Sequence, residues 1–245
     1  MLKITEQAIY NTLEAIIKKR YKVAAILFGG SRVINLQNSD SDYDLTVLLE
    51  PESFQQAELD SKIFGHSIPE YITYNDKLVH WYYTSPNCEQ NKFYHFDLWA
   101  IEAVYGYATY NSILKVWNSV TLIKYMQSLK NYLPTALDNC LSMYAEIISK
   151  IIEKPLQEIG FEITKEVYHL CAINLLLKNG TLTEQDRAFL KMVKTYAKQN
   201  NTFISTRLQN THDVAVIKKV KSNITELQQN AKTYKIQYQK IKDTL

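Results

Sequence analysis

Two aspartates separated by one residue are the side chains of this sequence best suited to hold a metal ion. Asp42 and Asp44 flank Tyr43 at the start of an alternating run, Tyr43–Leu49, that predicts a strand. Alternate residues of a strand point to the same face, so the two carboxylates converge. Mg²⁺ prefers carboxylate and phosphate oxygens as ligands. The pair therefore predicts a site for a magnesium-bound phosphate compound.

A glycine pair suited to phosphate precedes the aspartates. The apolar run Val23–Phe28 predicts a strand that ends at Gly29 and Gly30, and Ser31 follows where a helix would begin. Glycine lets the backbone approach an anion closely, and the unpaired N–H groups of a helix start attract negative charge. Arg32 comes next. A surface ion pair is one interpretation of its guanidinium.

The N-terminal elements that must position these motifs form a predicted sheet with flanking helices. The sheet would contain the two runs above, a hairpin and one more short strand, and it would follow an amphipathic helix capped by Thr5. These elements are the helix Thr5–Lys19, the hairpin strands Tyr71–Tyr74 and Leu78–Thr84 around Asn75–Lys77, and the strand Phe93–Leu98. His80 and His95 lie in strand-like stretches. We expect both to be packed side chains, because Mg²⁺ prefers oxygen.

From Trp99 onward the spacing of apolar residues is helical, which predicts an all-α second half. Proline and glycine then mark element ends, and Thr183 with Asp186 resembles a capping box. The features expected are Pro134 near a helix start, one helix from Leu137 to Ile152, Gly160 in a connection, and a helix Thr164–Asn179 ended by Gly180.

The last segment, residues 214–245, repeats apolar residues in a heptad pattern and carries seven lysines against two acidic residues. A long helix lying on the bundle with solvated lysines is the simpler interpretation. Self-association through the seam, or contact between its lysines and a phosphate-bearing partner, are the alternatives. The seam consists of Ile217, Val220, Ile224, Leu227, Ala231, Tyr234, Tyr238, Ile241 and Leu245.

The order of the motifs resembles the DNA polymerase β-like nucleotidyltransferase superfamily. Its signature, a Gly-Ser followed some ten residues later by Asp-x-Asp, corresponds here to Gly30-Ser31 and Asp42-Tyr43-Asp44, with Arg32 after the serine as in many small members. The segment Trp99 to Ser119 and the stretch Lys165–Leu170 further resemble predicted phage and bacterial nucleotidyltransferases. The second of these stretches is also similar to aminoglycoside nucleotidyltransferases.

The resemblance implies transfer of a nucleoside monophosphate from an NTP, with ATP expected, to an acceptor hydroxyl by a mechanism with two Mg²⁺ ions. Asp42 and Asp44 would bridge both ions, and Asp97, in Phe96-Asp97-Leu98, would be the third carboxylate at the attacking oxygen. Gly29, Gly30, Ser31 and Arg32 would bind the nucleotide phosphates. The acceptor would be a small molecule, an RNA end or a protein hydroxyl.

Composition limits the remaining classes of protein. The chain has 245 residues and a formal net charge of only +3, which argues against a strongly basic nucleic-acid-binding protein. Three cysteines without C-x-x-C spacing indicate free thiols in a reducing compartment. The sequence lacks the run of about 18 apolar residues that a membrane span requires. We therefore expect a cytoplasmic protein without membrane contact.

These observations predict an α+β protein. A mixed-sheet nucleotidyltransferase domain with flanking helices, residues 1–118, would precede an all-α helical bundle, residues 119–213, and the basic heptad helix, residues 214–245. Two alternatives to the transferase stay open. One is a catalytically weak or inactive nucleotide-binding or assembly protein of the same fold, able to form a homo-oligomer through its C-terminal helix. The other is a transferase that acts on RNA ends.

Overall fold

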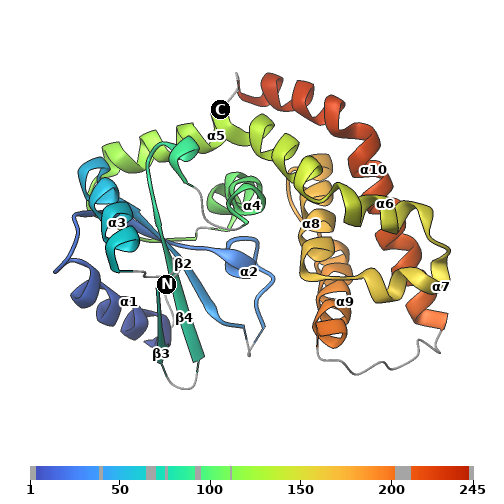
Figure 1. Cartoon of the computed structure of the whole chain (residues 1–245), viewed down its shortest axis with the longest axis horizontal. Coiled ribbons are helices and arrows are strands. Elements are labelled where there is room, and N and C mark those ends of the chain that lie inside the picture. The colour runs from blue at the N-terminus through green and yellow to red at the C-terminus, as the bar shows by residue number, and fades with distance from the viewer. Residues whose placement is uncertain are drawn as a thin grey trace. The chain divides into compact units, whose positions relative to one another are not determined.

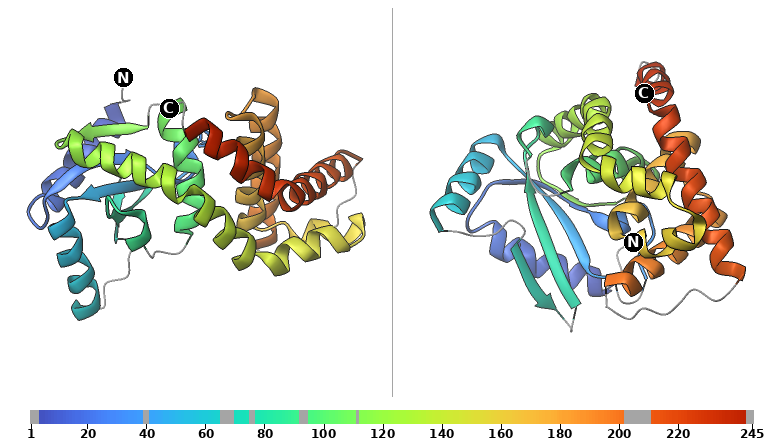
Figure 2. Two further views of the ribbon diagram at one scale, coloured as in Figure 1. Left: turned by 90° about the horizontal axis from the view of Figure 1, so that it is seen from above. Right: turned by 45° about the vertical axis from the view of Figure 1, so that its right-hand side comes forward.

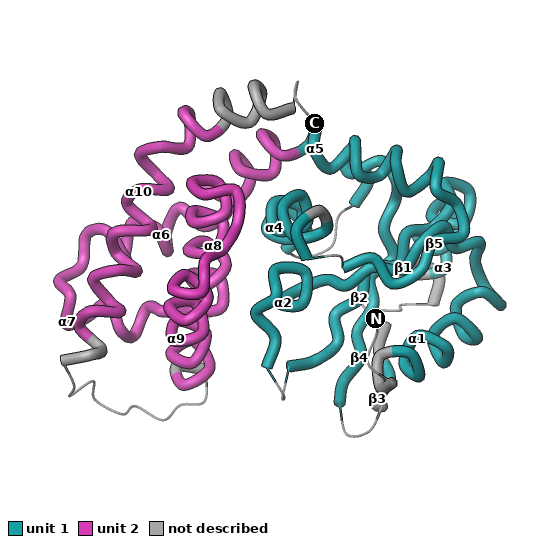
Figure 3. The backbone as a smooth tube through the Cα atoms, turned by 180° about the vertical axis from the view of Figure 1, so that it is seen from behind, with its two compact units in different colours: residues 1–132 teal, residues 133–245 magenta. Residues whose placement is uncertain are grey.

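The computed structural model describes residues 4–38, 41–64, 70–74, 77–91, 95–110, 112–201 and 211–242. It groups the chain into two compact units, Met1–Tyr132 and Leu133–Leu245 (Figure 3). The first contains the sheet, and every element described in the second is helical. The structure therefore confirms the predicted α+β class with a helical C-terminal region. The domain limits at residues 118 and 213 stay predictions.

The five-stranded sheet of unit 1 has the order β3-β4-β2-β1-β5 (Figure 1). β1 and β2 are antiparallel, with Phe28 opposite Leu45, and β5 runs antiparallel along the other edge of β1. β4 is parallel to β2 and antiparallel to β3, so the sheet is mixed. The strands are β1 Val23–Phe28, β2 Tyr43–Leu49, β3 Glu70–Tyr74, β4 Lys77–Thr84 and β5 Ile113–Val116.

One face of the sheet carries the apolar core of unit 1, covered by α1 (Ile4–Ile17) and α3 (Pro51–Phe64). Alternate residues of β2 and β4 point into this core, among them Leu45, Val47 and Trp81. Helix α1 contributes Ile9, Leu13 and Ile17 at the spacing that the sequence predicted, although Thr5 lies inside the helix and does not precede it.

The opposite face, which carries Asp44, is covered by α4 (Phe96–Thr109), together with the single turn α2 (Gly30–Val33) (Figures 1 and 2). Tyr107 of α4 donates a hydrogen bond to Thr46 Oγ1 over 3.3 Å, and the Trp99 ring meets the Tyr82 ring edge to face with centroids 4.5 Å apart. Helices α2 and α4 touch at Gly106, where a Cβ would lie 1.9 Å from the Val33 carbonyl oxygen.

Replacing Gly106 with alanine is expected to destabilise the protein, although the same change inside a helix normally stabilises it by about 1 kcal/mol. The added methyl would strike the Val33 backbone oxygen, and such overpacking typically costs about 1–3 kcal/mol. Urea unfolding of the variant should therefore show a lower midpoint with an unchanged slope. An unchanged or raised midpoint would show that the two helices separate without cost.

Two sequence expectations about unit 1 are wrong. Residues 93–98 were predicted to be a strand, but Phe96, Asp97 and Leu98 open helix α4, while Phe93 lies outside the described residues. The chain was predicted to be helical from Trp99 onward, but Ile113–Val116 form the edge strand β5. The hairpin is confirmed as β3 and β4; of its predicted turn, Asn75 and Asp76 lie outside the described residues, and Lys77 is already in β4.

Unit 2 is a helical bundle whose centre is α8, with ten consecutive residues, Val167–Leu176, buried. α10 and α9 pack on it, and α10 also contacts α6 and α7. The helices are α5 Ser119–Met143, which begins in unit 1, α6 Ala145–Glu153, α7 Leu156–Ile159, α8 Lys165–Asn179, α9 Glu184–Asn201 and α10 Thr211–Lys242. Two 3₁₀ turns, Cys88–Gln90 in unit 1 and Gly160–Glu162 here, complete the elements.

The capping signals of unit 2 are confirmed. Asp186 N–H donates to Thr183 Oγ1, and Thr183 N–H donates to Asp186 Oδ2, each over 3.1 Å, which is the reciprocal pattern of a capping box. Gly180 ends α8 in the left-handed conformation, with φ of 72°. The single helix expected from Leu137 to Ile152 is divided at Tyr144 into α5 and α6, and Pro134 lies inside α5, not near its start.

The heptad seam of α10 is buried within unit 2 from Ile217 to Tyr234, against α8, as in the simpler interpretation of the tail. Asn174 of α8 donates to Asn223 and Glu226 and accepts from the Tyr234 hydroxyl, so a hydrogen-bond network fixes the two helices in register. The side chains of Tyr238, Ile241 and Leu245 lie outside the described residues.

The three cysteines are free thiols, and all are buried. Burial raises the pKa of Cys88 to about 12, so this thiol stays protonated at neutral pH. Among the described residues, no helix combines the length and the apolar character needed to cross a bilayer.

Candidate active site

The glycine bend and the second aspartate form one compact structure. Gly29 N–H donates to the Asp44 carbonyl oxygen over 2.7 Å, which extends the β1–β2 ladder to the bend. Gly30 then adopts φ of 54°, and a Cβ on this residue would lie 2.2 Å from Asp44 Oδ2. The Asp44 carboxylate thus rests directly on the backbone of residue 30, a position that requires glycine for both conformation and space.

Asp42 and Asp44 are placed differently with respect to β2. Asp42 is exposed just before β2, and Asp44 is half-buried inside the strand. Tyr43, between them, points into the core on the other face. The structure therefore places the Asp44 carboxylate beside the Gly30–Ser31 bend, and the convergence of Asp42 with it stays a prediction.

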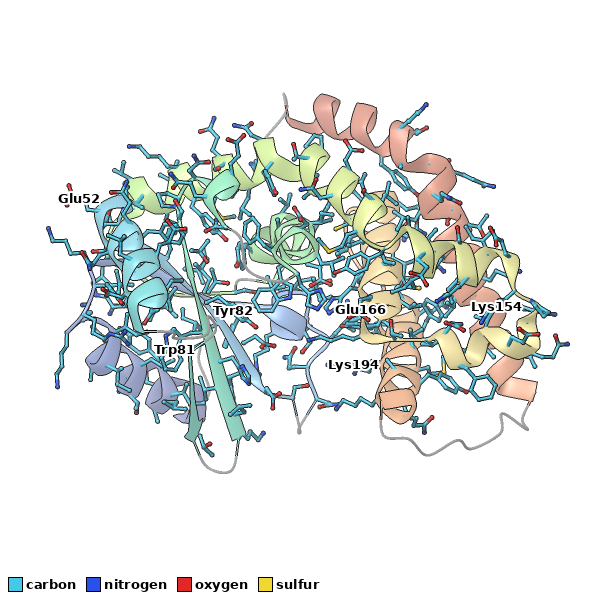
Figure 4. The ribbon with its side chains drawn as sticks, viewed as in Figure 1. Glu52, Trp81, Tyr82, Lys154, Glu166 and Lys194 are labelled. Atoms are coloured by element: carbon cyan, nitrogen blue, oxygen red, sulfur yellow. The ribbon has the colours of Figure 1, made fainter. Side chains whose placement is uncertain are left out.

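Aromatic side chains form the wall next to Asp44. Tyr82 and Trp81 are neighbours in β4 and point to opposite faces, Tyr82 to the Asp44 side (Figure 4). Burial, with a smaller contribution from the negative charge of Asp44, raises the pKa of Tyr82 to about 12. Burial likewise raises the pKa of Tyr107 to about 12. Both hydroxyls therefore stay protonated at neutral pH and serve as neutral hydrogen-bonding groups.

Trp99 extends this aromatic wall to the glycine bend. Its ring carbon Cζ3 would lie 3.3 Å from a Cβ at Gly29. The side chain is almost fully buried. Sequence reasoning did not assign Tyr82 or Trp99 to the site. The alternation in β4 was a signal for Tyr82, but the position of Trp99 follows from how α4 crosses the sheet.

Arg32 lies on the face opposite to Asp44. Its guanidinium carbon is 3.8 Å from the centre of the Tyr43 ring and 5.8 Å from that of Phe28, and its Nη2 donates to the Ser41 carbonyl oxygen over 3.4 Å. Phe28 pairs with Leu45 and so shares the side of Tyr43. The Arg32 guanidinium thus stacks on the Tyr43 ring beside the bend. Its binding to nucleotide phosphates stays a prediction.

Asp97 lies in the first turn of α4, where its Oδ1 accepts a hydrogen bond from the Tyr132 hydroxyl over 2.8 Å. Within the described ranges, which include all three aspartates, no group of three or more Asp, Glu, His or Cys side chains is close enough to hold a metal ion. The structure thus brings together Gly30 and Asp44, whereas Asp42 lies just before the strand. Asp97 as the third carboxylate stays a prediction.

Part of the chain, including Gly30 and Asp44, matches a known protein family. Residues 11–93, which include the bend, the aspartates and β4, match the family model of a nucleotidyltransferase domain. A nucleotidyltransferase-like protein from Exiguobacterium sibiricum 255-15 is a structural neighbour with 10% sequence identity and a TM-score of 0.29, covering 96% of this chain and 77% of that one. No curated protein matches the chain. The family match over residues 11–93 confirms the predicted resemblance to nucleotidyltransferases of the DNA polymerase β-like superfamily.

Proposed function

We propose that the protein transfers a nucleoside monophosphate from an NTP to an acceptor hydroxyl, with release of pyrophosphate. The observation that carries this proposal is the packing of Asp44 on the Gly30 backbone inside the matched domain. The proposal adds that Asp42, two residues earlier in the chain, shares the face of Asp44. Phosphoryl-transfer enzymes act mainly by positioning and by charge stabilisation, and this arrangement provides groups for both.

The donor set fits a hard divalent cation. Two carboxylates on one face would repel each other unless a cation lay between them, and carboxylate and phosphate oxygens are the ligands of Mg²⁺ in such sites. Asp42 and Asp44 would hold the metal, and we retain Asp97 as the proposed carboxylate for a second ion. The ions would activate the acceptor hydroxyl and stabilise the leaving pyrophosphate.

The chain's own contribution is to bind and orient the nucleotide. Backbone N–H groups at Gly30 and Ser31 would bind the triphosphate, and glycine at 30 leaves room for the Asp44 carboxylate beside them. The protonated Tyr82 hydroxyl offers a neutral hydrogen bond on the same face. Trp99 and Tyr107 fill the space behind and exclude water from the face of the sheet.

The proposed nucleotide is ATP, and the proposed acceptor is a small molecule, an RNA end or a protein hydroxyl. An RNA acceptor is supported by the exposed lysines of α10, Lys218, Lys219 and Lys232. The seam is buried from Ile217 to Tyr234. Along this part of α10, a second copy of the chain would therefore bind the exposed face that carries these lysines. The free thiols support a cytoplasmic location.

Nucleotide binding without turnover is the second candidate function. It is favoured by one observation: within the described residues, no third acidic side chain joins Asp42 and Asp44 closely enough to form a metal group.

Pyrophosphate release distinguishes the two functions. The protein would be incubated with Mg²⁺, each of the four NTPs in turn and a cell extract as the source of acceptor, and mass spectrometry would identify the molecule that gains a nucleotide. We expect one NTP to support release with the wild-type protein, and none with an Asp42→Asn/Asp44→Asn double variant. Equal release by both proteins would refute the transfer proposal.

A further inference from the structure

The register of β2 and β4 places a histidine next to the aspartate pair. In this parallel pair Asp44 lies opposite His80, and Thr46 lies opposite Tyr82. Opposite residues of neighbouring strands share a face, and their backbones are about 4.8 Å apart. His80 therefore extends from the same face as Asp44, and like Asp44 it is half-buried.

The strands next to β2 provide no acidic partner for the pair. β1 and β4, both fully described, contain no Asp or Glu: their sequences are VAAILF and KLVHWYYT. Asp97 belongs to α4 and accepts a hydrogen bond from Tyr132. The side chain that β4 places opposite Asp44 is thus an imidazole, where a site made only of oxygen donors would require a carboxylate.

We infer that a ring nitrogen of His80 is a ligand of the divalent ion held at Asp44, which makes the site one of mixed nitrogen and oxygen donors. The inference rests on the proposed function, because it concerns the ion of that same site. Imidazole suits transition metals, whereas Mg²⁺ favours sites made of oxygen. The site should therefore bind Mn²⁺ more tightly than Mg²⁺, by a larger margin than two carboxylates and phosphate oxygens would give.

Among the described residues, no three His, Cys, Asp or Glu side chains already lie close enough together to hold a metal ion. The inference is compatible with this finding. Asp44 and His80 are fixed at neighbouring positions by the ladder, whereas Asp42 is exposed just before the strand. An exposed side chain changes rotamer at little cost, so Asp42 can turn toward a cation that the other two groups bind first.

Electron paramagnetic resonance with Mn²⁺ as the probe tests this inference without relying on activity. In electron spin echo experiments on the full chain, the wild type should show coupling of the bound Mn²⁺ to ¹⁴N. His80→Gln should remove the coupling and raise the Kd for Mn²⁺ at least about 10-fold, since loss of even an indirect metal partner costs that much. His212→Gln, on α10, should change neither quantity.

Two further variants separate failure of this inference from failure of the proposed function. His80→Asp should lose the nitrogen coupling but retain Mn²⁺, with its preference shifted toward Mg²⁺. If the wild type binds Mn²⁺ and Asp44→Asn removes the binding, but no nitrogen coupling appears, the role of His80 is refuted and the proposed ion site stands. If the wild type binds no Mn²⁺, or Asp44→Asn leaves binding unchanged, both proposals fail. Thermal unfolding would confirm that each variant is folded.

Discussion

Replacing Asp44 with asparagine is expected to lower the rate of nucleotide transfer by at least about 100-fold. Loss of a single preorganised group that stabilises transition-state charge costs about that much, and Asp44 would hold the cation that neutralises the triphosphate. The amide occupies nearly the same volume as the carboxylate, so the contact with Gly30 is retained. The fold should therefore be preserved while kcat falls, as measured by pyrophosphate release at saturating nucleotide.

A matched control separates loss of the site from loss of a charge. Asp138 is an exposed carboxylate on α5, and Asp138→Asn removes the same charge from unit 2. This variant should keep the wild-type rate to within about twofold, because long-range effects between exposed charges are screened by salt. Parallel losses in both variants would mean that net charge, not the Asp44 carboxylate, governs the reaction.

Gly30→Ala is the second change with a large expected effect. The methyl group would meet Asp44 Oδ2 at 2.2 Å, so the carboxylate or the bend must move, and the positive φ of 54° adds about 1–2 kcal/mol of backbone strain. A displacement of about 1 Å at a reacting centre can cost about 100-fold in rate. We therefore expect a loss of at least that size in kcat/KM, together with a modest loss of stability.

Gly180→Ala is its control, because Gly180 has a positive φ of 72° but nothing within 4 Å of the added Cβ. Both variants should unfold at a lower urea concentration than the wild type because both positions have a positive φ, and Gly30→Ala should lose more stability because of its additional contact with Asp44. Only Gly30→Ala should lose nucleotide-transfer activity. If Gly180→Ala lost transfer to the same extent, the loss would come from reduced stability and not from the contact with Asp44.

The sequence predicted the strand that ends at the glycine bend and the strand that carries Asp44, because both patterns are local. A strand ended by Gly29 and Gly30, and two aspartates in alternation, need only short-range geometry to place their groups. The capping box at Thr183 and the end of α8 at Gly180 were predicted for the same reason.

Other features depended on contacts between distant segments. Asp97 between two apolar residues fits a strand or the first turn of an apolar helix, and the packing of α4 on the sheet decides between them. β5 has only four residues, too few to show a period. His80 reaches Asp44 through the register of two strands separated by a helix and a hairpin strand, and this register is absent from the local pattern.

A crystal structure with Mn²⁺ and a non-hydrolysable ATP analogue tests the central claim most directly. Mn²⁺ scatters X-rays anomalously, so its position can be measured independently of the rest of the density. The account predicts an anomalous peak within about 2.0–2.3 Å of Asp44 carboxylate oxygens, with the triphosphate against the Gly30–Ser31 backbone. A bound nucleotide elsewhere, or a peak far from Asp42 and Asp44, would contradict it.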